Sequence, residues 1–238
     1  IIWTDTLFPI KSYKMNKIQI ILDGYDQGDK NGGPTELAKI LHKSLLAFNG
    51  FKKSDLVNRY YHWWNTDAFD TGPTFAMVFQ KVSNGVSIDE ASIEVDKQLN
   101  GATAGCGPAH RIASIAGYKN IPTDRLISIA REEAAITHYH PDAGNCSAVM
   151  ALLCRHLIEG NSWSESKSIV SQNENVKPTW NKIINANLNN GGYVFDVMHS
   201  AIYFLDRANS LENSLSFAGP ANYCPVIVGI IQNIIKNS

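Results

Sequence analysis

Apolar residues recur every three to four positions along most of this chain, and this spacing limits its fold more than any other feature. In residues 36–48, Leu37, Leu41 and Leu45 fall on one face of a helix. A strand would instead alternate apolar and polar residues, and the one short apolar run, residues 18–22, fits either a strand or a helix end. The helical spacing continues in residues 124–137, 142–159, 193–208 and 222–235.

Polar residues that accept hydrogen bonds from free backbone N–H groups mark further helix starts. Capping-box spacing occurs twice, and a single serine is predicted to cap a third helix: Ser87 with Glu90, Ser162 with Glu165, and Ser54. Strands do not alternate with helices, which argues against a Rossmann sheet. We therefore predict an all-α fold in one compact domain over residues 1–238, with residues 1–17 as an extension.

The composition is that of a folded chain. Of the 238 residues, 44% are hydrophobic and 18% are charged, which excludes a disordered chain. The 21 Lys and Arg residues balance the 22 Asp and Glu residues without a basic block, so no nucleic-acid partner is expected. Residues 225–235 form the longest apolar run, too short for a membrane span. The four cysteines form no C-x-x-C pair, which favours reduced thiols in an intracellular compartment.

Several segments rich in Gly, Pro and polar residues interrupt the helical pattern. The first, residues 23–36, holds three aspartates and four glycines directly before a helix. Glycines let a ligand approach the backbone closely. Gly33, Pro34 and Thr35 then stand at a helix N-terminus, where free N–H groups favour an anion such as phosphate. The alternative is a capped loop exposed to solvent.

The next two interruptions also lead into helices. In residues 69–74, Asp70 or Thr71 is expected to be an N-cap. Residues 101–111 contain three glycines, a thiol, an imidazole and the guanidinium of Arg111. Arg111 could bind a phosphate through two N–H groups, or it could form a salt bridge with a neighbouring carboxylate.

The fourth segment, residues 137–142, contains two histidines. The spacing of His138 and His140 invites a zinc site, but no third ligand has a matching spacing. The alternative is a helix start at His140 or Asp142, with Pro141 in the first turn.

A cysteine–histidine pair is a further hypothesis. Cys106 stands at a loop–helix boundary and could be a nucleophile with His110 or His138 as its base. The sequence does not fix either distance. A fifth interruption, residues 218–225, precedes the last apolar helix.

In this order, the interruptions resemble the motifs of the ADP-ribosylglycohydrolase family, from about residue 23 to residue 235. Five stretches are similar to family motifs: Gly32-Gly33-Pro34-Thr35 to Thr-Asp-Asp-Thr, Phe69-Asp70-Thr71-Gly72 to F-D-x-G-x-T, Gly105 to Ala113 to G-N-G-x-x-M-R-x-A-P, Thr137 to Ala143 to T-H-x-H-P-x-A, and Gly192-Tyr193-Val194 to G-Y-V. The resemblance implies a compact orthogonal helical bundle with a dinuclear magnesium site. Family members remove ADP-ribose from proteins, and some are lens crystallins.

The departures from the family pattern fall on the metal ligands. Gly33 and Pro34 replace the first aspartate pair. The second metal motif, Gly-Gly-Asp-Thr-Asp-Thr, falls near residues 219–224, which contain no aspartate, and Cys106 replaces the asparagine of G-N-G. Magnesium prefers hard oxygen ligands such as carboxylates. We therefore expect no dinuclear magnesium site and no cofactor.

The aspartates of the first loop offer a replacement for the lost carboxylates. We expect Asp29, with Asp26 as the alternative, to provide the carboxylate that cleavage of a ribosyl bond needs. Asp70 would help to position the ribose, as the resemblance implies. Ligand contacts are expected from Gly32, Gly33, Thr35, Thr71, Gly105, Cys106, Gly107, Arg111, His138 and Asn222.

The resulting hypothesis is a hydrolase of an ADP-ribosyl or related ribosyl glycosidic bond. Its partner would be an ADP-ribose-like small molecule or an ADP-ribosylated protein. The rival hypothesis is a non-catalytic nucleotide-binding module or structural subunit, because a fold alone does not determine function. Aspartates that meet Asp70 and His138 in one cleft would favour an enzyme, and aspartates on the outer surface would favour the structural role.

Overall fold

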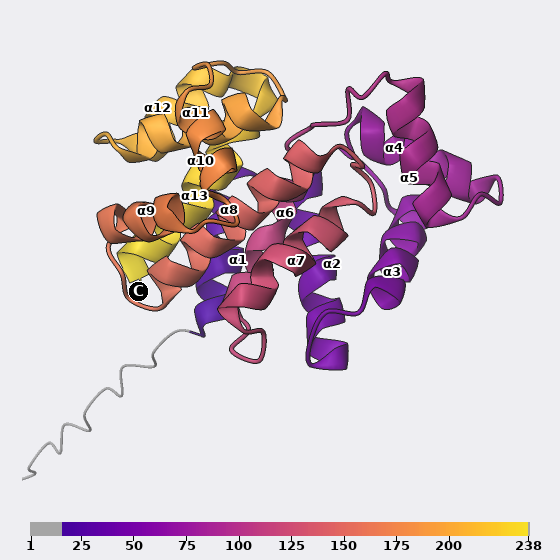
Figure 1. Ribbon diagram of the computed structural model, residues 1–238, viewed down its shortest axis with the longest axis horizontal. Coiled ribbons are helices and arrows are strands. Elements are labelled where there is room, and N and C mark those ends of the chain that lie inside the picture. Colours follow the sequence, from indigo (N-terminus) through magenta and orange to yellow (C-terminus); the bar gives the residue numbers. More distant parts are fainter. Residues whose placement is uncertain (1–15, 238) are drawn as a thin grey trace, which may run out of the picture.

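The computed structural model of the protein describes residues 16–237, which form thirteen α-helices and two 3₁₀-helices (Figure 1). The helices are α1 (Lys17–Gly28), α2 (Gly33–Phe48), α3 (Lys53–Thr66), α4 (Pro73–Ser83), α5 (Ile88–Gln98), α6 (Gly107–Arg111), η1 (Ile112–Gly117), α7 (Thr123–Ala134), α8 (Pro141–Ile158), α9 (Trp163–Gln172), α10 (Lys177–Ile184), α11 (Val194–Leu205), α12 (Ser210–Ala218), η2 (Gly219–Ala221) and α13 (Tyr223–Asn237).

The all-α prediction is confirmed. The ambiguous run at residues 18–22 lies within α1, and the only β pairing in residues 16–237 is one isolated bridge between Gly105 and Tyr193. No helix in this part of the chain has both the length and the apolar character needed to cross a bilayer. The single domain over residues 1–238 stays a prediction, and residues 1–15 of the predicted extension lie outside the described residues.

The helix starts follow the sequence signals in part. Ser162 and Glu165 form a complete capping box at α9, and the Ser87 hydroxyl accepts the Glu90 N–H at α5. Ser54 does not cap α3, which begins one residue earlier with Lys52 in the N-cap position. Asp70 and Thr71 do not cap α4 either, because Gly72 takes that position with φ of 74° and no side-chain cap. Asp70 therefore remains available for other contacts.

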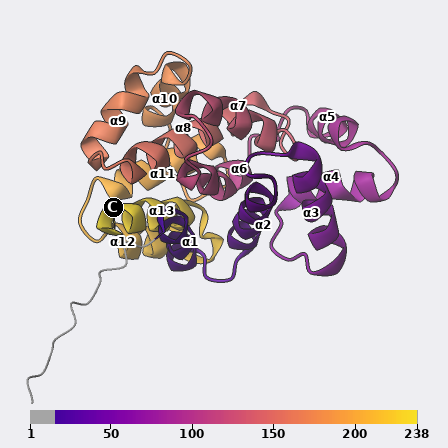
Figure 2. The ribbon, with the colours of Figure 1, turned by 90° about the horizontal axis from the view of Figure 1, so that it is seen from below.

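Helices from the two ends of the chain pack side by side through glycines (Figures 1 and 2). A Cβ atom on Gly28 of α1 would lie 2.1 Å from the carbonyl oxygen of Pro225 in α13. A Cβ atom on Gly24 would lie 2.7 Å from the Cα of Ile230. Only glycine permits helix axes to approach this closely. The contact brings the loop after α1, which carries Asp29, next to the start of α13.

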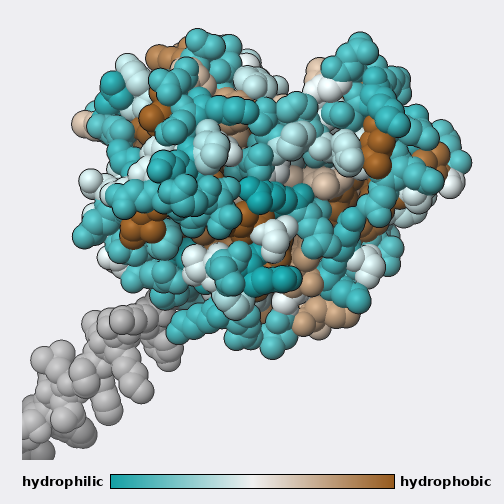
Figure 3. Space-filling view, in the orientation of Figure 1, coloured by the Kyte–Doolittle hydropathy of each residue, from teal (hydrophilic) through white to brown (hydrophobic). Residues whose placement is uncertain are grey.

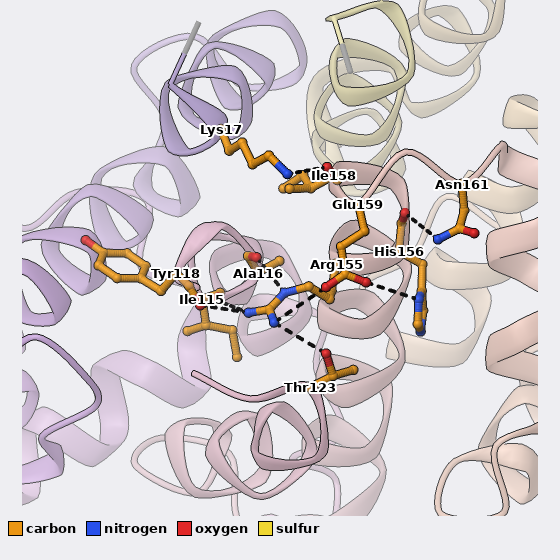
Figure 4. Close-up of polar contacts among 10 residues, drawn as sticks. All are labelled: Lys17, Ile115, Ala116, Tyr118, Thr123, Arg155, His156, Ile158, Glu159 and Asn161. Carbon is orange, nitrogen blue, oxygen red and sulfur yellow. Dashed lines mark hydrogen bonds and ion pairs between the residues drawn. The ribbon is translucent and has the colours of Figure 1, made fainter. Parts of the chain in front are cut away.

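Helix α8 is largely buried, and it packs against the segment that contains α6 and η1. Arg155 of α8 is buried, and its guanidinium donates to the carbonyl oxygens of Ala116 at 2.8 Å and Tyr118 at 2.9 Å (Figure 4). These carbonyls stand at the end of η1, where the helical hydrogen bonds run out, and the Tyr118 carbonyl also accepts the Ile121 N–H at 3.1 Å. The opposite end of the same segment begins at Gly107, beside the cavity described next.

Candidate active site

A cavity of about 730 Å³ opens where several helices begin. Figure 3 shows the surface notched between the α4–α5 side of the molecule and the α11–α12 side. The first turns of α4 and α13, the loop before α6 and the start of α8 all contribute to the lining. The cavity size suits a ligand of nucleotide dimensions. Its polar and titratable lining residues are Asp29, Asp70, Thr71, Thr74, Cys106, His110, His138, His140, Asp142, Tyr193, Asn222 and Tyr223.

Asp29 lies on the cavity wall while also capping α2. Its carboxylate oxygen Oδ2 accepts hydrogen bonds from the Thr35 N–H at 3.4 Å and the Thr35 hydroxyl at 3.2 Å. The residue is buried, with 7% of its surface exposed. Burial raises the pKa of Asp29, the bonds from Thr35 lower it, and the nearby charge of Asp70 raises it further. The loop is therefore capped, as one sequence hypothesis held, but Asp29 is buried in the cavity lining rather than exposed to solvent.

Asp70 approaches the same helix end from the loop before α4. Its Oδ2 accepts the Gly33 N–H at 3.4 Å. Its own backbone has a φ of 44°, in the left-handed region. The start of α2 thus holds two carboxylates, which its partial positive charge stabilises. Thr71 lines the cavity beside Asp70.

The Gly105–Gly107 turn forms another part of the wall. The Cys106 N–H donates to the Gly192 carbonyl at 3.1 Å, and the Val194 N–H donates to the Ala104 carbonyl at 3.0 Å. These bonds hold the turn against Tyr193, which stands half exposed in the lining. Burial raises the pKa of the Cys106 thiol to about 12. A neutral thiol is a poor nucleophile, so the electrostatics disfavour the cysteine–histidine hypothesis.

His138 lies beneath this turn, and His110 lines the same cavity. Burial, followed by the charge of Arg111, lowers the pKa of His138 to about 3. Burial also lowers the pKa of His110 to about 4. Both rings are therefore neutral near pH 7. His140 starts α8, and its Nδ1 accepts the Asp142 N–H at 3.2 Å, which confirms the helix-start interpretation of this segment.

Arg111 is not part of the cavity lining. It is 1% exposed and forms an ion pair with Glu133 of α7, with Nε and Oε1 2.5 Å apart. Its Nη2 donates to the Thr137 hydroxyl at 2.9 Å, and its guanidinium lies over the Tyr60 ring. The structure therefore matches the salt-bridge alternative for Arg111. Because its guanidinium is buried away from the cavity, it does not contact a phosphate bound there.

Four other predicted residues also lie outside the lining. Asp26 is exposed on α1 and faces Lys39 of α2, 3.9 Å away. The other three contact the two aspartates at the start of α2: Gly33 bonds to Asp70, Thr35 bonds to Asp29, and Gly32 packs against Asp29. A Cβ atom on Gly32 would lie 1.9 Å from Asp29 Oδ1. Asn222 does line the cavity.

Three prominent lining residues were not among the predicted site residues: Asp142, Tyr193 and Tyr223. Asp142 and Tyr193 lie in sequence stretches that resemble family motifs, and this resemblance could have identified them as site residues.

A magnesium pair needs several carboxylates from both sides of the site. Gly33 has no room for one, because a Cβ atom there would lie 2.2 Å from the Asp70 carbonyl oxygen. The segment from Pro220 to Tyr223 lines the opposite side without a carboxylate. Within residues 16–237, no three His, Cys, Asp or Glu side chains are grouped to hold a metal ion. Neither of the two positions where the family carries its aspartates therefore supplies a carboxylate to a divalent cation.

Comparisons with known proteins agree with this architecture. A protein of Acanthamoeba polyphaga mimivirus, named as a candidate ADP-ribosyl glycohydrolase, is 21% identical over 55% of this chain and 40% of its own length. The matched region thus spans less than half of that relative. A model of the ADP-ribosylglycohydrolase family matches residues 16–221. Because this match covers most of the sequence, the chain belongs to the ADP-ribosylglycohydrolase family.

Proposed function

We propose that the protein hydrolyses an ADP-ribosyl or related ribosyl glycosidic bond, with Asp29 as the base and without a magnesium pair. The observation that carries this proposal is the meeting of Asp29, Asp70 and His138, distant in sequence, on one cavity. The family membership supports the substrate class. The missing carboxylates at Gly33 and in residues 219–224 support a reaction that depends on the chain's own side chains.

The chemistry needs a base for water and negative charge near an oxocarbenium-like transition state. Asp29 suits the first role, because a raised pKa brings a carboxylate closer to the working pH of a general base. It would take a proton from water as the new C–O bond forms, while the electron pair of the glycosidic bond leaves with the aglycone. Asp70, anchored by the Gly33 N–H, would face the positive charge on the ribose.

The helix starts supply sites for the anionic part of the ligand. Helix α4 begins without a side-chain cap, and Pro73 and Thr74 of its first turn line the cavity. Tyr223 and Val226 of the first turn of α13 do so as well. Free N–H groups at helix starts bind phosphate oxygens. This favours a diphosphate-bearing ligand, either free ADP-ribose or an ADP-ribosylated protein.

The rival function is a cavity that binds a nucleotide without catalysis. Among residues 16–237, no Lys or Arg side chain lines the cavity, although a purely anion-binding module would be expected to use one. The three carboxylates on the wall, Asp29, Asp70 and Asp142, instead favour chemistry at the ribose.

The test is release of ADP-ribose from an ADP-ribosylated peptide by the wild-type chain, the Asp29→Asn variant and the Asp26→Asn variant. We expect Asp29→Asn to lower kcat by about 10²–10⁴-fold. Asp26→Asn removes a carboxylate three residues away, on the exposed side of α1 and outside the cavity, and should retain wild-type activity. Binding of ADP-ribose without any release by the wild-type chain would instead support the rival.

A further inference from the structure

A chain of buried polar groups runs from α7 to the cavity wall. Glu133 accepts hydrogen bonds at Oε1 from Arg111 Nε at 2.5 Å and from the Tyr60 hydroxyl at 2.9 Å. Arg111 Nη2 continues the chain to the Thr137 hydroxyl, which lies 2.8 Å from His138 Nδ1. All of these side chains are buried, and only His138 lines the cavity.

The direction of each hydrogen bond in this chain follows from chemistry. A guanidinium can only donate, so the Thr137 oxygen accepts from Arg111. The Thr137 hydroxyl then has its own proton to donate, and His138 Nδ1 is the acceptor within reach. A neutral imidazole that accepts at Nδ1 carries its proton on Nε2. Burial and the Arg111 charge favour the neutral ring, since they lower its pKa to about 3.

The Nε2 edge of His138 lies under the Gly105–Gly107 turn. A Cβ atom on Gly105 would be 3.1 Å from Nε2, and one on Gly107 would be 3.6 Å from it. Both glycines line the cavity. No residue among those described accepts a hydrogen bond from Nε2. Because glycine has no side chain, positions 105 and 107 leave the Nε2 edge of His138 accessible to a ligand.

We propose that Glu133, Arg111 and Thr137 act as positioning residues that hold His138 as the Nε2–H tautomer, so that the ring presents a donor to an oxygen acceptor of the ligand. The contact with ligand rests on the proposed function, whereas the tautomer does not. The acceptor would be a hydroxyl of the ribose to be released or a diphosphate oxygen. In this account, Arg111 acts on the ligand through two other side chains and never touches it.

The tautomer can be measured directly by NMR on the full chain with ¹⁵N-labelled histidine, with His138 assigned through a His138→Gln variant. Two-bond couplings to the ring protons distinguish a protonated Nε2 from a protonated Nδ1. We expect the Nε2–H pattern for His138, unchanged between pH 5 and pH 8. The groups that face it, Arg111 and His110, do not change charge in this range, because burial lowers the pKa of His110 to about 4. A Nδ1–H pattern or a charged ring would overturn the proposal.

Thr137→Val and Thr137→Ser form the matched pair of variants. Valine has the shape of threonine but no hydroxyl, so the tautomers should mix and ADP-ribose affinity should fall about tenfold, the usual size of one lost hydrogen bond. Serine keeps the oxygen and should keep both the spectrum and the affinity. A pure Nε2–H pattern with unchanged affinity in Thr137→Val contradicts the proposal. If this variant fails to fold by circular dichroism, the wild-type spectrum decides.

Two ligands locate the acceptor. ADP-ribose and ADP share the diphosphate, but only ADP-ribose carries the second ribose. A shift of the His138 Nε2 signal with ADP-ribose alone indicates a ribose hydroxyl, and a shift with both indicates the diphosphate. Saturation by ADP-ribose with no change at Nε2 would overturn the ligand contact. Absence of hydrolysis would refute only the proposed function, because the tautomer is read on the free protein.

Discussion

At the scale of single residues, Asp29 combines a structural and a chemical role. Its carboxylate accepts hydrogen bonds from Thr35 at the start of α2, and the residue also lines the cavity. Burial and the neighbouring Asp70 make ionisation of Asp29 unfavourable, so its pKa is raised. A group that is costly to ionise in the folded state reduces stability whenever it is charged. This produces two predictions, one for stability and one for catalysis.

The stability prediction concerns Asp29→Asn. The raised pKa means that the folded chain holds this proton more tightly than the unfolded chain. Stability is therefore lost as pH rises from the ordinary aspartate pKa of about 3.9 through the raised folded-state value. Asparagine keeps an oxygen acceptor for Thr35 and carries no charge. We expect urea denaturation at pH 7 to give Asp29→Asn an unfolding free energy at least equal to wild type, with the difference shrinking toward pH 3. A loss of stability at pH 7 would contradict this interpretation.

The catalytic prediction concerns pH. A general base must be ionised, so kcat/KM should fall as pH drops through the raised pKa of Asp29. Burial keeps His110 and His138 neutral down to about pH 4 and about pH 3, so neither should add a limb between pH 5 and pH 8. The measurement is kcat/KM for an ADP-ribosylated peptide from about pH 3 to about pH 9, a range that includes the ordinary aspartate pKa. An acid limb at or below the ordinary aspartate value would exclude Asp29 as the base.

At the scale of helices, the site depends on how closely α1 approaches α13. Gly28→Ala would place a Cβ atom 2.1 Å from the Pro225 carbonyl oxygen, so the helices would have to move apart. We expect a loss of about 1–3 kcal/mol in unfolding free energy, as overpacking typically costs. Gly50→Ala is the control, since its Cβ atom would come no nearer than 4.0 Å to a neighbouring atom. Equal thermal unfolding of the two variants would show that the close contact is unimportant.

The segment containing α6 and η1 depends on Arg155 in the same way. Arg155→Lys removes the planar fork that reaches the Ala116 and Tyr118 carbonyls, and a single ammonium cannot satisfy both positions (Figure 4). The Tyr118 carbonyl would keep its hydrogen bond from the Ile121 N–H, so the loss falls on the Ala116 carbonyl. An unsatisfied buried carbonyl costs about 1–3 kcal/mol. Chemical denaturation should show a loss of this size. An unchanged midpoint would mean that water satisfies the Ala116 carbonyl.

Local sequence signals predicted the helices well and the side-chain partners poorly. Ser162 and Glu165 are three residues apart, so their capping box can be recognised from sequence alone. The partner of Arg111 could not be identified, because Glu133 is one of several carboxylates and only the packing of α6 against α7 selects it. Likewise, the Gly33 N–H that binds Asp70 comes from 37 residues away, which no N-cap rule anticipates.

At the scale of the whole molecule, the fold brings the interruptions of the helical pattern to one cavity. Segments around Asp29, Asp70, Cys106, His138 and Asn222 all reach it, although each is a helix start in a different part of the chain. The order of these segments in the sequence indicated the family. The resemblance to that family then implied that the segments lie together in the folded chain. What the motifs could not reveal is that the space for the missing aspartate at Gly33 is filled by the Asp70 backbone.

The most direct test of this account is hydrolysis of an ADP-ribosylated peptide by the full chain, with excess EDTA in one arm and added magnesium chloride in the other. The cavity offers Asp29, Asp70 and Asp142 but no carboxylates at Gly33 or in residues 220–223, where a magnesium pair would need them, so the rate should not depend on magnesium. We predict equal kcat in both arms, and loss of activity in both with Asp29→Asn. Activity that disappears in EDTA and returns with magnesium would contradict the account.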